Sequence, residues 1–186
     1  LIFIVLNLIF YYFFAGWFWF TIMTTVGYGN QAPSSPGGRA LVFTLGFLSI
    51  LLFGTVLATT GTVISLVVED FLKRTHLKFL ASKVVMIVVW CTFYCIWLIW
   101  IAYYYQEWSS IRLDTETELG DNFWFAYITT TTVGLGDYYP TPEVLFLNDL
   151  LGFSLIFLFG FVLLSAFLAE LTQFLAHFFP DMGHEL

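Results

Sequence analysis

The chain has 186 residues, of which 60% are hydrophobic, 22% are aromatic and only 10% are charged. A water-soluble domain carries about 25% charged residues, so this composition excludes an ordinary soluble enzyme, a disordered segment and a coiled coil. The formal net charge of -7 disfavours nucleic acid as a partner. The composition indicates a protein whose solvent is a lipid bilayer.

Residues 1–14 are apolar and begin without an initiator methionine. A helix of this length reaches only about 21 Å, which is less than the hydrocarbon core of about 30 Å. We therefore expect a fragment or a processed chain, in which these residues are the end of an incomplete first outer helix.

Three longer stretches carry no charge: residues 40–68, 84–105 and 150–169. Each meets the length of about 20 apolar residues that a membrane span requires. Four of the six basic residues lie between the first two spans, which places the linker 69–83 in the cytoplasm. The loop 106–122 is then extracellular and strongly acidic, and it is either simply solvated or an anionic vestibule that concentrates cations.

The sequence contains an internal repeat. A shift of 107 residues places residues 17–33 on residues 124–140, so that Trp17 meets Trp124 and Gly29 meets Gly136. Further on, a shift of 106 aligns residues 45–57 with 151–163. One residue is lost between the two blocks, as a loop would allow. The pattern predicts a tandem duplication of a unit of about 107 residues.

Each repeat contains a short segment with glycine at alternate positions. The first reads Thr25-Val26-Gly27-Tyr28-Gly29, and the second reads Thr132-Val133-Gly134-Leu135-Gly136. Glycine permits backbone conformations that other residues disfavour, so that successive carbonyls can point the same way. Backbone exposed at membrane depth is tolerated where it lines a polar conduit. We expect stacked carbonyl oxygens, with the hydroxyls of Thr25 and Thr132 as the innermost ring, to replace the hydration shell of a cation.

With their neighbours, these segments read TTVGYG at residues 24–29 and TTVGLGD at residues 131–137. They resemble the two filters of the two-pore-domain potassium channels, a family in which the second filter often has Leu or Phe for Tyr, as at Leu135. The resemblance implies an all-α membrane protein that repeats outer helix, pore helix, filter and inner helix. It implies K+ as the permeant ion and no cofactor. Because a filter needs four pore loops, it also implies a homodimer, with a heterodimer as the alternative.

The predicted elements follow from this order. The pore helices are expected at residues 15–24 and 122–131, and the inner helices at residues 40–68 and 144–179. The predicted domains are a first pore unit at 1–68, a cytoplasmic linker at 69–83, a second pore unit at 84–179 and a cytoplasmic tail at 180–186. Trp17 and Trp124 lie early on the pore helices and either pack behind the filters or anchor the chain at the membrane interface.

Three residues are candidates for modulating conduction: Asn30, Asp137 and Glu170. Only the second filter is followed by a carboxylate, so Asp137 either modulates conductance with external pH or ties the filter to its pore helix. An ionisable group at membrane depth is a functional candidate, and Glu170 is placed to face the cytoplasmic mouth. Asp149 lies near the outer end, where an interfacial position explains it.

The remaining sequence narrows the function. It has no helix with basic residues at every third position, which a voltage sensor requires, and it has no candidate enzyme site. We predict a potassium-selective leak channel subunit in the plasma membrane, with an intracellular membrane as the alternative. Two other functions stay open: a regulatory subunit that resembles a channel, and a weakly selective cation channel, because Leu135 and Asn30 alter the hydrogen bonding behind the filter. A membrane enzyme or a membrane scaffold is the remaining alternative, from a different class of function.

Overall fold

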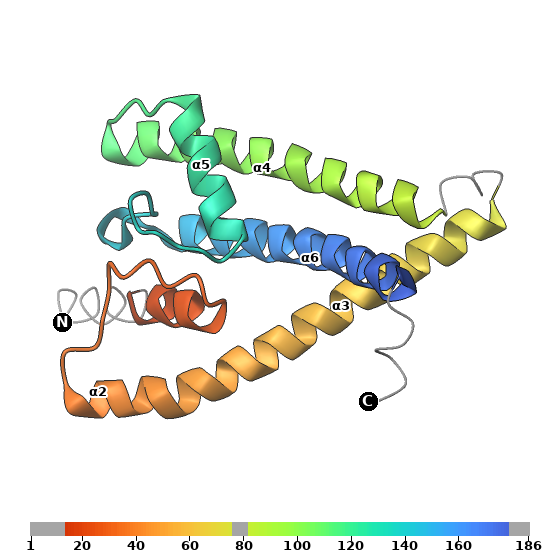
Figure 1. Ribbon diagram of the computed structural model, residues 1–186. Helices are drawn as coiled ribbons and strands as arrows, with labels where there is room; N and C mark the ends of the chain where they lie inside the picture. The colour runs from red at the N-terminus through yellow and green to blue at the C-terminus, as the bar shows by residue number, and fades with distance from the viewer. Residues whose placement is uncertain (1–13, 76–81, 179–186) are drawn as a thin grey trace. The chain divides into compact units, whose positions relative to one another are not determined.

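The computed structural model describes residues 14–75 and 82–178, and every regular element in these residues is helical. This confirms the predicted all-α fold. The elements in chain order are a helix at Phe14–Met23, α2 (Pro36–Leu41), the π-helix η1 (Val42–Gly46), α3 (Phe47–Arg74), α4 (Lys83–Leu113), α5 (Leu119–Thr130), the 3-10 helix η3 (Pro142–Val144) and α6 (Leu147–Phe178). Figure 1 labels α2 to α6.

Three helical stretches in the described part of the chain are long and apolar enough to cross a membrane: Pro36–Arg74, Lys83–Leu113 and Leu147–Ala176. Their mean hydropathies are 2.4, 2.4 and 2.5. The three predicted spans are therefore confirmed, and each is longer than its uncharged run. The protein is an integral membrane protein.

The first of these stretches, Pro36–Arg74, begins before and ends after the expected bounds of residues 40–68. Ser35 caps α2, because its Oγ accepts a hydrogen bond from the backbone N–H of Gly38 at 3.1 Å, and Pro36 follows at the first helical position. At the other end, Lys73 pairs with Glu69 at 2.6 Å across one helical turn. Such pairs favour helix over coil, so α3 takes in residues that we expected in the linker 69–83.

The helix α4 extends to Leu113, so residues 106–113 are helical where we expected an extracellular loop. The reason is tertiary packing of its last two turns. Trp108 and Ser109 are buried, and the Trp108 ring meets the Phe153 ring edge-on with centroids 5.3 Å apart. Such aromatic contacts stabilise a helix whose polar sequence alone reads as a loop.

The π-helix η1 joins α2 to α3 without a break. Gly46 closes it and is buried against the helix Phe14–Met23, where Ile22 Cγ2 lies 3.3 Å from the position that a Cβ at Gly46 would take. A π-turn holds more residues than an α-turn, and η1 overlaps the stretch in which the first repeat is one residue longer than the second.

The chain divides into two compact units. The first holds the described residues up to Gly54 together with Leu98–Leu158, and the second holds Thr55–Trp97 and the described residues from Phe159 onward. The core of the first unit is aromatic, with Trp17, Phe125 and Phe153 fully buried. Both glycine-alternating segments lie in this unit, so this rigid core supports them.

Candidate functional site

The two glycine-alternating segments have the same unusual backbone. Positive φ angles occur at alternate positions: Thr25 (60°), Gly27 (53°), Gly29 (78°), Thr132 (60°), Gly134 (54°) and Gly136 (79°). A β-branched residue such as threonine disfavours this region, at a cost of about 1–3 kcal/mol per residue. The surrounding structure imposes this conformation twice, which marks both segments as functional candidates.

Each segment is tied to the helix before it by matching hydrogen bonds. In the first repeat the donors and acceptors are Gly27 N to Thr21 O (3.1 Å) and Thr24 Oγ1 to Phe20 O (2.7 Å). In the second they are Gly134 N to Ile128 O (2.9 Å) and Thr131 Oγ1 to Tyr127 O (2.7 Å). Every atom pair is related by the shift of 107 residues found in the sequence, so the duplication is also a structural repeat.

The two segments lie side by side within the first unit. A Cβ built at Gly134 would overlap the carbonyl of Val26, and one at Gly136 would overlap the carbonyl of Tyr28. Only glycine leaves room for this approach. In residues 14–75 and 82–178 no group of three or more His, Cys, Asp or Glu side chains could hold a metal ion. The oxygens that this place offers to a cation are backbone carbonyls and threonine hydroxyls.

The side chain of Tyr28 anchors the first segment. Its hydroxyl lies 2.8 Å from Thr129 Oγ1 on α5, the helix of the other repeat. Its ring stacks on the Trp17 ring, with centroids 6.4 Å apart and planes 13° from parallel. Trp17 therefore packs against the first segment, which is one of the two roles that its place in the sequence suggested.

The outward side chains of the two segments differ sharply in burial. Val26 and Tyr28 are only 3% and 6% exposed, whereas Val133 and Leu135, which match them in the repeat, are 54% and 59% exposed. The second segment therefore presents two apolar side chains that the described part of the chain leaves more than half exposed.

Asp137 follows the second segment and bonds to the helix before it. The Trp124 indole Nε1–H donates to Asp137 Oδ2 at 2.7 Å. In the first repeat Asn30 replaces the carboxylate, and the buried Trp17 Nε1–H has no hydrogen-bond partner among the described residues. The second repeat thus has an indole hydrogen bond in addition to the matching bonds, and the corresponding indole of the first repeat has none among the described residues.

The sequence profile of the ion-channel family matches residues 1–66 and 82–177, which is most of the chain. This chain belongs to the ion-channel family. This family is one of ion channels, not of enzymes.

Relatives of this ion channel are potassium channels by name. The chain is 28% identical over 138 residues to human Potassium channel subfamily K member 2, covering 68% of this chain and 29% of that protein. It is 27% identical over 142 residues to Open rectifier potassium channel protein 1 of Drosophila melanogaster, covering 68% of this chain and 13% of that protein. Potassium channel subfamily K member 4 of Rattus norvegicus is 28% identical over 140 residues, covering 69% of this chain and 32% of that protein. The resemblance to two-pore-domain potassium channels is confirmed, although the chain spans less than a third of these relatives.

Arg112, in the last turn of α4, is held by Asp149 in the first turn of α6. Its Nε lies 3.0 Å from Asp149 Oδ2 and its Nη2 lies 3.2 Å from Oδ1, and the guanidinium stacks 4.3 Å from the Phe146 ring centroid. No sequence pattern indicates this pair, although Arg112 is the one basic residue of an acidic segment. Because Asp149 engages that charge, the neighbouring carboxylates lose it as a counter-ion.

Acidic side chains also gather within the first unit. A hydrogen bond with Asp121, reinforced by the charges of Asp137 and Glu118, raises the pKa of the half-buried Tyr138 hydroxyl. A pocket of about 590 Å3 beside α4 has Glu107 and Glu116 on its wall. The two interpretations of the loop, a solvated segment or an anionic vestibule, both stay predictions.

Glu170 differs from its expected place. It is fully buried on α6, where Ser65 of α3 donates a hydrogen bond to Glu170 Oε1. It therefore does not face an open mouth in this chain, but belongs to a cluster of side chains that joins three helices of the channel.

Proposed function

We propose that the chain is a subunit of a potassium-selective channel with a leak-type conductance, and that residues 25–29 and 132–136 form its filter. The observation that carries the proposal is the repeated backbone: alternate positive φ angles and matching hydrogen bonds in both segments. Carbonyl oxygens held in this way can replace the water around a dehydrated K+ ion, with the Thr25 and Thr132 hydroxyls innermost. The names of the relatives favour K+ as the ion.

The chain crosses the membrane several times, with the basic linker 69–83 and the tail 180–186 in the cytoplasm. The linker joins two pore units, residues 1–68 and 84–179. The plasma membrane is the proposed location, and an intracellular membrane is the alternative. In this orientation Asp137 and the acidic residues of the first unit face the extracellular side, where they attract cations.

A closed filter requires a second copy of the chain, because one chain supplies only two of four segments. The unequal burial of the two segments supports this homodimer. Val26 and Tyr28 of the first segment are buried beside the second repeat, whereas Val133 and Leu135 are more than half exposed. Twofold symmetry gives the second segment the same cover from the first repeat of the partner, and a similar subunit can take that place in a heterodimer.

The residue types agree with this pairing. The shift of 107 residues relates Tyr28 to Leu135 and Thr129 to Ile22. Tyr28 meets Thr129, two hydroxyls, within the chain. In the dimer, Leu135 then meets Ile22 of the partner subunit, two apolar side chains. Each contact joins groups of like polarity. Two positions paired by chance would not need to match in this way.

The reversal potential of the purified full chain in planar bilayers tests the proposed function. Under a K+ gradient we expect the reversal to follow the K+ equilibrium potential, and replacement of K+ by Na+ on one side should shift it strongly. A reversal that stays near zero under that replacement contradicts selectivity. Light scattering of the same preparation measures whether the conducting species contains two chains.

A weakly selective cation channel is the second candidate. The observation that favours it is the asymmetry of the filter, since Leu135 lacks the hydroxyl by which Tyr28 reaches Thr129. A filter held by fewer bonds adapts more easily to Na+. The permeability ratio of Na+ to K+ from the same recordings separates the two candidates.

A further inference from the structure

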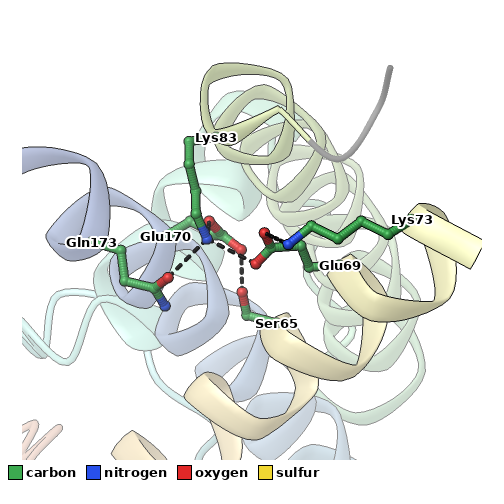
Figure 2. A network of polar contacts seen from close by, with 6 residues as sticks. All are labelled: Ser65, Glu69, Lys73, Lys83, Glu170 and Gln173. Carbon is green, nitrogen blue, oxygen red and sulfur yellow. Dashed lines mark hydrogen bonds and ion pairs between the residues drawn. The ribbon is translucent and has the colours of Figure 1, made fainter. Parts of the chain in front are cut away.

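A cluster of six polar side chains lies within the second unit, and Figure 2 shows it. It consists of Ser65, Glu69 and Lys73 of α3, Lys83 at the start of α4, and Glu170 and Gln173 of α6. The ammonium of Lys83 lies 2.8 Å from Glu69 Oε2, 2.8 Å from Gln173 Oε1 and 3.4 Å from Glu170 Oε2. The Lys83 side chain thus binds residues of both inner helices, α3 and α6.

The same two helices are in close contact one to two turns further along. A Cβ at Gly61 would overlap the backbone and side chain of Ser165, and Ser165 Oγ donates to the carbonyl of Leu57 at 2.9 Å. Small residues at such a crossing allow two helices to approach closely in a membrane. The polar cluster therefore extends a close contact between α3 and α6 that begins at Gly61 and Ser165.

Lys83 and Lys73 both bind Glu69, but their surroundings differ. Lys73 has 59% of its side chain exposed, and water can replace it as a partner of Glu69. Lys83 is 35% exposed and bridges to Glu170, which is fully buried. Without Lys83, the Ser65 hydroxyl is the one partner that the Glu170 carboxylate keeps among the described residues. A buried charge without a counter-ion is strongly unfavourable, and separation of the two helices is a way to hydrate it.

We propose that Lys83 is a positioning residue of the channel, which holds the inner ends of α3 and α6 together and so sets the spacing of the inner helices. The proposal rests on the proposed function, because the spacing of these helices bears on conduction only if the chain forms a pore. The clamp itself is a property of one chain and can be measured without any current.

The test uses a cysteine placed beside the cluster. Ala166 is fully buried on α6, one helical turn before Glu170. The parent for this test is the full chain with Cys91→Ala, Cys95→Ala and Ala166→Cys. Its one introduced cysteine, at position 166, should react slowly with a charged thiol reagent. Adding Lys83→Met should raise the reaction rate by roughly tenfold or more, because the unpaired Glu170 opens the contact. Adding Glu170→Gln to that variant should return the rate toward the parent value, since no buried charge then lacks a partner.

Two matched variants control this experiment. Lys83→Arg keeps the positive charge and should keep the rate near that of the parent. Lys73→Met removes the same charge from an exposed partner of the same Glu69, and should change the rate by less than about twofold, as expected for a surface pair. An unchanged rate in Lys83→Met, or a rate that Glu170→Gln fails to restore, overturns the clamp.

Single-channel recordings of the same variants connect the clamp to conduction. In a conducting parent, Lys83→Met should change the open probability, and Glu170→Gln should reverse that change. An unaltered open probability in Lys83→Met, with a lower thermal midpoint alone, overturns the positioning role. If the parent carries no K+ current while the cysteine rates follow the expected order, the clamp is supported and the proposed channel function is not.

Discussion

The hydroxyl of Tyr28 lies 2.8 Å from the hydroxyl of Thr129, so the first glycine-alternating segment is bonded to the helix that precedes the second. Both side chains are buried. The bond spans 101 residues of sequence and joins the two halves of the duplication. It makes the position of one segment depend on the other repeat, which bears directly on how rigid a filter built from them is.

Removal of this bond should loosen the filter. Tyr28→Phe leaves the Thr129 hydroxyl buried without its partner, which should cost about 1–3 kcal/mol and lower the thermal midpoint of the purified chain. We expect the permeability ratio of K+ to Na+, measured from reversal potentials, to fall as well. Thr129→Ser keeps a hydroxyl and is the control. Because Tyr28→Phe and Thr129→Val break the same bond, their effects should not add, and additive effects would argue against the bond.

Glycine should be required at position 134. Gly134→Ala adds a methyl group where the Val26 carbonyl lies and at a φ of 54°, so we expect loss of K+ current from a chain that still inserts into the membrane. Gly120→Ala is the matched control, since nothing lies within 4 Å of the added Cβ on α5. Current and membrane-inserted protein are measured for both variants. Normal current in Gly134→Ala contradicts the proposed filter.

The proposed dimer contact between Leu135 and Ile22 of the partner subunit can be tested by exchanging its polarity. Leu135→Tyr buries a hydroxyl against an apolar side chain, which should cost about 1–3 kcal/mol per contact and lower the fraction of dimer. Ile22→Thr supplies the missing partner, so the double variant should regain dimer by light scattering. If Ile22→Thr worsens the defect of Leu135→Tyr instead, the two residues do not meet as proposed.

The carboxylate of Asp137 should attract cations to the outer mouth. Asp137→Asn removes the charge and leaves a carbonyl oxygen that can still accept from Trp124, so inward single-channel conductance should fall at low salt. Asn30→Asp adds a carboxylate at the matching place and should raise it. Both effects should shrink as salt increases, because the Debye length drops from about 30 Å at 0.01 M to about 3 Å at 1 M. Equal effects at both salt concentrations point to a role in holding the filter instead.

Local patterns allowed much of this protein to be predicted. The spans are uncharged runs of sufficient length, and the repeat and its glycines are visible in the letters alone. These features depend on residues close together in the chain. The all-α fold and the ion-channel family follow from them, and both are confirmed.

The contacts that sequence could not provide join distant residues. Arg112 and Asp149 are 37 positions apart, and Lys83 and Glu170 are 87 apart. Each of these four residues lies at or near the end of an apolar run, and many partners are compatible with such a pattern. The extension of α4 has the same origin, because the aromatic contacts of Trp108 come from α6. Tertiary packing decides these points, and local propensity does not.

The π-turn at Val42–Gly46 has a consequence for how the two repeats have diverged. An extra residue in a regular α-helix rotates everything after it by about 100°, and the inner helix would then present different side chains to its neighbours. A wider turn confines the insertion to one place, so the side chains beyond it keep their directions. The two repeats could thus come to differ in length while their inner helices keep the same side-chain directions.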